Sequence, residues 1–189
     1  MEAREFFDNI ADHWDSLETH TEADLLPFVA QAVPPNGKVL DLGCGTGIIV
    51  KILHDYLNCD VTALDISKKM ISIAKSKYAN YPDIRFICGD FYSFNEGNFD
   101  TVVVFNAYPH FMEVQAFRDK LIQVLKPHGR FAILHNLGRA QLEKCHNDIE
   151  PISRSLLPIQ QESEYFTAQF NIIRSEETTN SYILIGERK

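Results

Sequence analysis

The chain has 189 residues, a length that suffices for one α/β domain with a packed core. Its composition, 45% hydrophobic and 23% charged, excludes a fibrous or disordered chain. Its 26 acidic residues against 18 basic ones give a net charge of −8. A nucleic-acid binder usually presents a basic face, so we expect no nucleic-acid partner.

The predicted elements begin with two helices. From Phe6 to Leu17 the apolar residues recur at three- and four-residue spacing, which predicts an amphipathic helix. A second helix is expected over residues 22–32, because the breaker Pro-Pro-Asn-Gly follows at residues 34–37.

Short apolar strands then alternate with helices. The run at residues 99–105 is almost wholly apolar, as in a central strand covered on both faces. Ser67 is a good N-cap for a helix that begins at residue 68. This alternation predicts parallel pairing with right-handed crossovers, and therefore an open doubly wound sheet. The predicted strands cover residues 38–42, 60–65, 84–88, 99–105 and 130–135, and the predicted helices cover residues 47–57, 68–79, 113–125 and 138–148.

The pattern changes after residue 148. Residues 148–169 are weakly patterned, and we expect them to cover part of a ligand pocket. Two strand-like runs at 170–175 and 181–187 follow, separated only by a polar turn. They must pair as a hairpin, because a parallel crossover needs about a dozen residues or more. One strand at the end of the sheet is therefore expected to be antiparallel.

The cysteines and the lengths of the apolar runs indicate the cellular compartment of the protein. The four cysteines are well separated and form no Cys-x-x-Cys pair, which is typical of a reducing cytosol rather than of a disulfide framework or zinc knuckle. Residues 1–15 lack the apolar stretch of a signal peptide, and no run approaches the ~18 apolar residues of a membrane span. We expect a cytoplasmic monomer or homodimer with no membrane partner and no metal site.

The most informative segment leaves a strand and enters a helix. It reads V-L-D-L-G-C-G-T-G from Val39 to Gly47, and its glycines let a ligand approach the backbone closely. Ile48 stands where the dinucleotide motif G-x-G-x-x-G has its third glycine. Asp41 would repel a pyrophosphate but favour the cationic end of a methionyl ligand. The segment therefore favours S-adenosylmethionine (SAM) over NAD.

Two further acids follow the next two strands. Asp65 lies 20 residues after Gly45, where a carboxylate can accept hydrogen bonds from both ribose hydroxyls. Ser67 is better placed than Asp65 to cap the next helix, which weakens a purely structural role. Asp90 and Phe91 follow the third strand, where they could bind the amino group of adenine and cover its ring.

These motifs, in order, resemble the class I SAM-dependent methyltransferases. V-L-D-L-G-C-G-T-G, A-L-D-I-S, G-D-F, F-D-T-V-V-V and L-K-P-H-G-R-F cover residues 38–135 in the family's order and spacing. The resemblance implies an α/β fold with a Rossmann-like, doubly wound, seven-stranded sheet, mostly parallel with an antiparallel last strand, plus N-terminal helices. It also implies that SAM is the methyl donor, that S-adenosylhomocysteine (SAH) is the product, and that a small molecule accepts the methyl group.

The resemblance also assigns parts of the chain. Residues 1–189 would form a single domain, with a helical lid at 1–36, a cofactor-binding core at 37–136, and an acceptor-side helix and C-terminal hairpin at 137–189. Trp14 would belong to the lid, although simple core packing is an alternative for it. The implied cofactor residues are Asp41, Gly43, Cys44, Gly45 and Gly47 at the amino-acid part, Asp65 and Ile66 at the ribose, Asp90 and Phe91 at adenine, together with Asn106 and Trp14.

The acceptor is expected at the carboxyl ends of the fourth and fifth strands. Methyl transfer from a sulfonium is an in-line displacement, which needs alignment and, where the acceptor must lose a proton, a base. Histidine can titrate near neutral pH, so each histidine here is either a base or a structural residue. The candidate acceptor-site residues are Asn106, Tyr108, His110, His135 and His146.

Two other functions stay open. An NAD(P)-dependent Rossmann oxidoreductase is disfavoured by the missing third glycine, and a non-catalytic SAM-binding regulatory module is disfavoured by the polar groups of the acceptor side. The tetrapeptide Asn106-Ala107-Tyr108-Pro109 departs from the Asn/Asp-Pro-Pro-Tyr of relatives that methylate exocyclic amino groups or glutamine amides. With the acidic charge, this counts against methylation of a nucleobase amino group.

Overall fold

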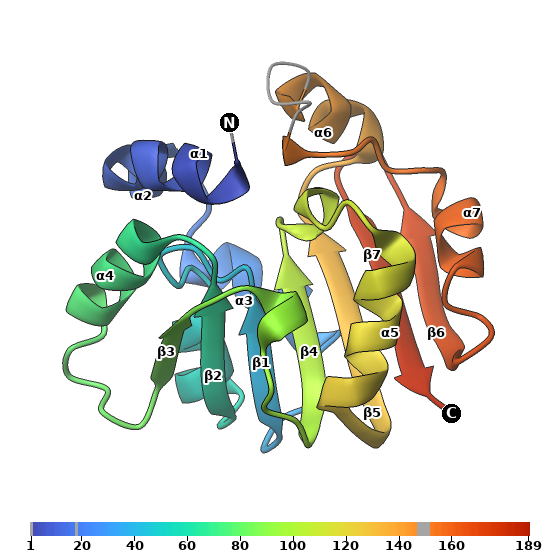
Figure 1. The fold of residues 1–189 in the computed structure, drawn as a ribbon, viewed down its shortest axis with the longest axis horizontal. Helices are drawn as coiled ribbons and strands as arrows, with labels where there is room; N and C mark the ends of the chain where they lie inside the picture. The colour runs from blue at the N-terminus through green and yellow to red at the C-terminus, as the bar shows by residue number, and fades with distance from the viewer. Residues whose placement is uncertain (1, 18, 147–151) are drawn as a thin grey trace.

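One mixed sheet of seven strands forms the centre of the molecule, in the order β3-β2-β1-β4-β5-β7-β6 (Figure 1). The computed structural model describes residues 2–17, 19–146 and 152–189. Neighbouring strands from β3 to β5 pair in parallel, and β7 runs antiparallel to both β5 and β6. The strands are β1 (Lys38–Leu42), β2 (Asp60–Asp65), β3 (Arg85–Cys88), β4 (Phe99–Phe105), β5 (Leu125–His135), β6 (Phe170–Glu177) and β7 (Tyr182–Arg188).

This topology confirms the predicted doubly wound sheet, its antiparallel last strand and the terminal hairpin of β6 and β7. The hairpin places β7 next to β5, so the last strand of the sequence is not the edge of the sheet. No helix among the described residues is long and apolar enough to cross a membrane.

Helices cover both faces of the sheet. One hydrophobic core lies between the sheet and α3 (Glu22–Ala30), η2 (Ile52–Tyr56) and α4 (Lys68–Lys77). The other lies between the sheet and α5 (Val114–Val124) with α7 (Ile159–Glu164). The remaining helices are α1 (Ala3–Ile10), η1 (Ala11–His13), α2 (Trp14–Leu17), η3 (Phe91–Ser93), η4 (Tyr108–His110) and α6 (Arg139–His146).

The N-terminal helices and α6 lie at one edge of the sheet. In Figure 1 the arrows of β1, β4 and β5 point upward, and α1, α2 and α6 sit above the arrowheads. These helices therefore stand over the carboxyl ends of the parallel strands, where doubly wound folds bind ligands.

The segment after the glycine loop differs from the predicted helix over residues 47–57. Residues 52–56 form a π-helix, η2, preceded by turns. The hydroxyl of Tyr78 donates to the carbonyl of Gly47 at 2.7 Å. A side chain thus engages a backbone carbonyl that a regular helix would use in its own hydrogen bonds, and such an insertion is a known cause of helix irregularity.

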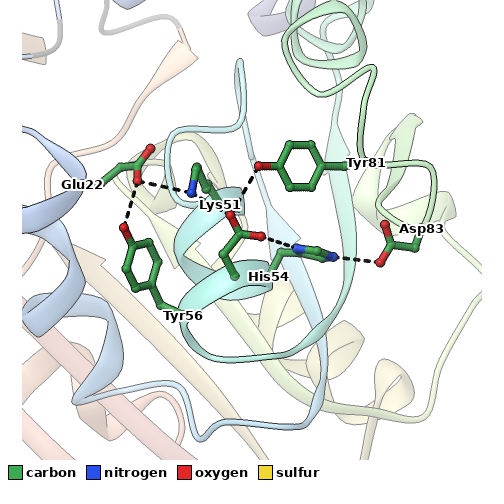
Figure 2. A network of polar contacts seen from close by, with 7 residues as sticks. Glu22, Lys51, His54, Tyr56, Tyr81 and Asp83 are labelled. Carbon is green, nitrogen blue, oxygen red and sulfur yellow. Dashed lines mark hydrogen bonds and ion pairs between the residues drawn. The ribbon is translucent and has the colours of Figure 1, made fainter.

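A network of polar side chains surrounds η2 (Figure 2). The ring of His54 lies between two carboxylates, 2.6 Å from Asp55 and 2.8 Å from Asp83. Lys51 is 2.6 Å from Asp55 and 3.7 Å from Glu22. The network therefore ties η2 to α3 on one side and to the loop before β3 on the other.

Other local features follow the sequence closely. Ser67 caps α4, since its hydroxyl accepts the amide of Met70 at 3.1 Å, and the lysines of α4 are exposed, as expected of a solvated helix face. Three further features differ from prediction. The single helix expected from Phe6 to Leu17 is divided into α1, η1 and α2. The strand β5 begins at Leu125 rather than at residue 130, and α7 forms in the segment that the sequence pattern leaves without an element.

Candidate cofactor and acceptor site

A cavity of about 530 Å³ opens at the carboxyl ends of β1 to β4, beneath the N-terminal helices. Its volume is in the range of small-molecule and cofactor pockets. The structure brings together, along the wall of this cavity, the predicted cofactor residues Trp14, Asp41, Gly43, Cys44, Gly45, Asp65, Ile66, Asp90, Phe91 and Asn106.

The glycine loop has the backbone conformation that its sequence predicts. Gly43 and Gly45 have φ values of +71° and +54°, in the left-handed region that glycine tolerates best. A Cβ on Gly43 would lie 2.6 Å from the Cβ of Ala107, and one on Gly45 would lie 3.3 Å from Nε1 of Trp14. Larger residues at these two positions would therefore crowd the cavity and its cover.

Asp41 is the most perturbed carboxyl group of the site. It is 1% exposed, and its Oδ2 has no hydrogen-bond partner among the described residues. Burial, with the nearby charge of Asp65, raises the pKa of Asp41 to about 8. An unpartnered buried carboxyl in a cavity wall is suited to a ligand that brings a positive charge or donated protons.

Asp65 holds the glycine loop against the end of β2. Its Oδ2 accepts the amide of Gly45 and its Oδ1 the amide of Ser67, both at 2.8 Å. Burial raises the pKa of this carboxyl, against these hydrogen bonds. A carboxylate has about four acceptor positions, so Asp65 keeps acceptor capacity toward the cavity in addition to its structural role.

Asp90 also has a structural role beside its place in the cavity wall. It caps η3, where its Oδ2 accepts the amide of Ser93 at 3.2 Å and the hydroxyl of Ser93 at 3.1 Å. The next residue, Phe91, is 3% exposed and lines the cavity. An acid and an aromatic ring thus meet at the end of β3, as the sequence predicts.

Carboxylates attach the first part of the predicted lid to the rest of the protein, and α1 itself has no buried residue. Asp8 accepts the hydroxyl of Ser67 at 2.6 Å and the amide of Lys69 at 3.0 Å. Asp15 pairs with Lys77 at 2.7 Å and accepts a hydrogen bond from the hydroxyl of Thr46.

Polar side chains line the part of the cavity where the sequence analysis expects the acceptor. The Nδ2 of Asn106 donates to Oδ1 of Asn136 at 2.8 Å, and the amide of Asn136 donates to Oδ1 of Asn106 at 3.2 Å. His110 lines the same cavity, with its Nδ1 2.9 Å from the carbonyl oxygen of Ile152. Its ring lies edge to face against Phe7 of the lid, with the centroids 4.9 Å apart.

Comparison with known proteins identifies the family. A family model described as a methyltransferase domain matches residues 40–133, which contain the glycine loop and the ends of β1 to β4. The chain is also 35% identical, over 107 residues, to the ubiquinone/menaquinone biosynthesis C-methyltransferase UbiE of Wigglesworthia glossinidia brevipalpis, an alignment covering 53% of this chain and 43% of that protein. The chain belongs to the class I SAM-dependent methyltransferases.

Other methyltransferases match more of the chain. Malonyl-[acyl-carrier protein] O-methyltransferase 1 of Ilyobacter polytropus is 25% identical over 173 residues, covering 88% of this chain and 64% of the relative. The crystal structure of magnesium protoporphyrin IX methyltransferase (ChlM) from Synechocystis PCC 6803 with bound SAH shares the fold, with a TM-score of 0.73, 20% identity and 98% of each chain covered. The chain spans about half the length of the curated relatives it matches, 43% and 64% of these two.

Three of the predicted methyltransferase site residues, Gly47, Tyr108 and His135, are absent from the cavity wall, and a fourth cannot be placed. Gly47 turns the chain toward α4, where a Cβ would lie 2.9 Å from the ring of Tyr78. The side chain of His146 lies outside the described residues. The two others, Tyr108 and His135, are fully buried.

Strand geometry explains the position of His135, and a hydrogen bond to α7 explains that of Tyr108. Side chains alternate along a strand, so His135 points to the same face of the sheet as Ile133, toward α5 and α7. There its ring lies against the ring of Tyr182, with the two centroids 6.1 Å apart. The hydroxyl of Tyr108 donates to Glu162 of α7 at 2.7 Å. The prediction that these two side chains face an acceptor is therefore wrong in this structure.

The structure adds cavity residues that the sequence analysis missed. Asn136 lines the cavity where His135 was expected, because the alternation of β5 turns the next side chain outward. His20, in the loop between α2 and α3, lines the cavity as well, and its Nδ1 lies 3.2 Å from Nδ2 of Asn136. Asn136 could have been predicted because it directly follows a parallel strand, whereas no local sequence pattern indicates His20.

Proposed function

We propose that this methyltransferase binds SAM in the cavity and transfers its methyl group to a small-molecule acceptor, leaving SAH. The observation that carries the proposal is the buried carboxyl of Asp41, whose Oδ2 has no hydrogen-bond partner among the described residues. A buried carboxylate needs a compensating charge or donor, and the ammonium group of the methionyl part of SAM is both. Bound SAM supplies the electrophilic methyl group, and the residues of the chain bind and orient it.

The cavity residues suit the parts of SAM in turn. Gly43 and Gly45 leave room for the methionyl chain beside Asp41, and Asp65 has acceptor capacity for the ribose hydroxyls beside Ile66. The remaining predicted contacts are Asp90 and Phe91 at adenine, Cys44 in the loop, Asn106, and Trp14 as cover.

We assign the role of base to His110. The carbonyl oxygen of Ile152 can only accept a hydrogen bond, so Nδ1 of His110 must be the protonated nitrogen. In the neutral ring the lone pair then lies on Nε2. A base at this position accepts a proton from the acceptor atom as the bond to the methyl carbon forms.

The acceptor that we propose is a small molecule whose reacting atom carries an ionisable proton. The relatives named above are a C-methyltransferase, an O-methyltransferase and a porphyrin methyltransferase, so they do not agree on one acceptor. A base beside the cavity suits an acceptor atom that carries an ionisable proton. The net charge of −8 supports a small molecule rather than a nucleic acid, and we place the protein in the cytoplasm as a monomer or homodimer.

Ligand-dependent melting tests the proposal. A ligand that binds only the native state raises the unfolding temperature in proportion to the logarithm of its concentration. We expect SAM and SAH to raise the melting temperature, and NAD and NADP to leave it unchanged. Stabilisation by NAD or NADP without SAH would instead support the oxidoreductase alternative. A screen of small-molecule acceptors that follows SAH release would then separate an enzyme from a regulatory SAM-binding module.

A further inference from the structure

A buried cluster of polar side chains lies next to the acceptor side of the cavity without lining it. Its centre is Glu162, which is 0% exposed. Arg154 donates to both carboxylate oxygens of Glu162, at 2.6 Å and 3.2 Å. The hydroxyl of Tyr108 donates to Oε1 at 2.7 Å, and the amide of Leu157 donates to Oε2 at 3.1 Å.

The energetics of such a cluster point to a role other than stability. Removing two charges from water is expensive, and a well-packed apolar replacement is often as stable as a buried ion pair. A fully hydrogen-bonded pair, however, fixes the geometry of the segments it joins. The segments joined here are the turn of Tyr108 to Phe111 and the chain from Ile152 to Glu162.

The turn that carries His110 is bonded to this cluster on both sides of the histidine. The amide of Arg154 donates to the carbonyl of Pro109 at 3.0 Å, and its Nε donates to the carbonyl of Phe111 at 3.4 Å. The guanidinium of Arg154 also lies over the ring of Tyr108, 4.7 Å from its centroid. Arg154 therefore holds the residues before and after His110.

The same segment holds the ring of His110. Ile152, two residues before Arg154, presents the carbonyl that accepts Nδ1–H of His110 at 2.9 Å. The position of that carbonyl depends on Arg154, and the position of Arg154 depends on its bidentate contact with Glu162. A chain of direct contacts thus runs from Glu162 to the histidine ring in the cavity.

We propose that Arg154 and Glu162, joined by Tyr108, form a positioning unit that fixes the ring of His110 in the wall of the cavity and in its Nδ1–H form. This inference rests on the proposed role of His110 as the base. The three residues touch neither cofactor nor acceptor in this arrangement. They act through the turn and through the carbonyl of Ile152.

The test is nitrogen-15 NMR of the histidine ring, combined with the Kd for SAH and with turnover. The variants are Glu162→Gln, which removes the charge that Arg154 pairs with, and the milder Tyr108→Phe, which removes one hydroxyl. Glu177→Gln is the matched control, because Glu177 pairs with Arg139 at 3.0 Å and accepts the amide of Ile159 at 3.1 Å, yet has no contact with the turn.

We expect His110 to show the Nδ1–H pattern in the unmodified protein and in Glu177→Gln. In Glu162→Gln we expect a mixture of both ring forms, a pH–rate profile shifted from that of the unmodified enzyme, and a Kd for SAH within about twofold of it. Tyr108→Phe should change the same readouts less. Because Tyr108→Phe removes a single hydroxyl, the ring form of His110 in this variant tests the positioning unit if Glu162→Gln does not fold.

Two results separate this inference from the proposed function. An unchanged ring form in folded Glu162→Gln, or in Tyr108→Phe if only that variant folds, overturns the positioning unit even if SAM binds and turnover proceeds. A ring form that responds to these variants in a protein without affinity for SAM or SAH supports the positioning unit and contradicts the function.

Discussion

At the scale of single residues, Asp41 combines a cost to stability with a proposed use in binding. In the ligand-free protein its pKa lies near 8, against an ordinary value of 3.8. The native state therefore holds a proton between these values that the unfolded state has lost. Stability must then fall as the pH rises from about 4 to about 8.

Asp41→Asn removes this dependence, because an amide does not ionise. We expect the melting temperature of the ligand-free variant, relative to that of the unmodified protein, to increase from about pH 5 to about pH 8. Thermal unfolding across this range measures the difference, and two parallel profiles would contradict the assignment. Binding of SAM should weaken in the variant, since the compensating carboxylate for the ammonium group is lost.

His110 is the residue whose replacement should separate binding from chemistry. His110→Ala should lower turnover about 100-fold or more, in the range of a lost general base, and leave the Kd for SAH close to that of the unmodified enzyme. His128→Asn is the control, because His128 is exposed and has a φ of 60° that asparagine tolerates. Equal turnover in both variants would remove His110 from the reaction.

The site residues differ in how well local sequence predicts them. Asp41, Asp65 and Asp90 could be predicted because each lies within two residues of the end of a strand, and the carboxyl ends of parallel strands share one edge. Tyr108 and His135 also lie at strand ends, but their side chains turn into the interior. Which way a terminal side chain points depends on α7 and β7, which come much later in the chain.

At the scale of elements, the strands were easier to predict than the helices. An apolar run bounded by glycine or proline predicts a buried strand from a few residues, whereas η2 departs from an α-helix because of the distant hydroxyl of Tyr78. The helix α7 has the sequence Ile-Gln-Gln-Glu-Ser-Glu and no side-chain cap. Its position depends on the tertiary partners of Glu162, which no local pattern contains.

The network around η2 gives a pH-dependent prediction for this element. Hydrogen bonds to Asp55 and Asp83 raise the pKa of His54 above its usual 6.5. The native state thus binds a proton that the unfolded state loses first, so the network stabilises the fold below about pH 6.5 and loses this effect as the pH rises through the higher native pKa.

His54→Gln should therefore destabilise the protein more at about pH 6 than at about pH 9. The measurement is the difference in melting temperature between variant and unmodified protein at the two pH values. A difference that stays constant, or that grows with pH, would show that the charged form of His54 does not contribute to the network.

At the scale of the whole molecule, the sheet carries the ligand groups and the N-terminal helices cover them. The lid is held by Asp8 and Asp15, which contact α4, its N-cap and the glycine loop. Exposed pairs of this kind are individually weak and are screened by salt. We therefore expect that α1 and α2, the part of the predicted lid before α3, can move away from the cavity without unfolding the two cores of the sheet.

Asp8→Asn combined with Asp15→Asn should loosen this lid. We expect SAH to dissociate about tenfold faster, which corresponds to about 1.4 kcal/mol, with little change in melting temperature without ligand. Stopped-flow displacement of SAH measures the rate. Glu96→Gln is the control, because it breaks the pair of Arg85 and Glu96, whose N–O distance is 2.6 Å, at residues that do not line the cavity.

The contact of Phe7 with His110 has a kinetic consequence. Phe7 lines the cavity and also touches His110, the proposed base. On the proposed function, the N-terminal helices would then both retain SAM and complete the wall that the acceptor meets. We expect a compulsory order in which SAM enters first and SAH departs last. Product inhibition by SAH should then be competitive against SAM and mixed against the acceptor.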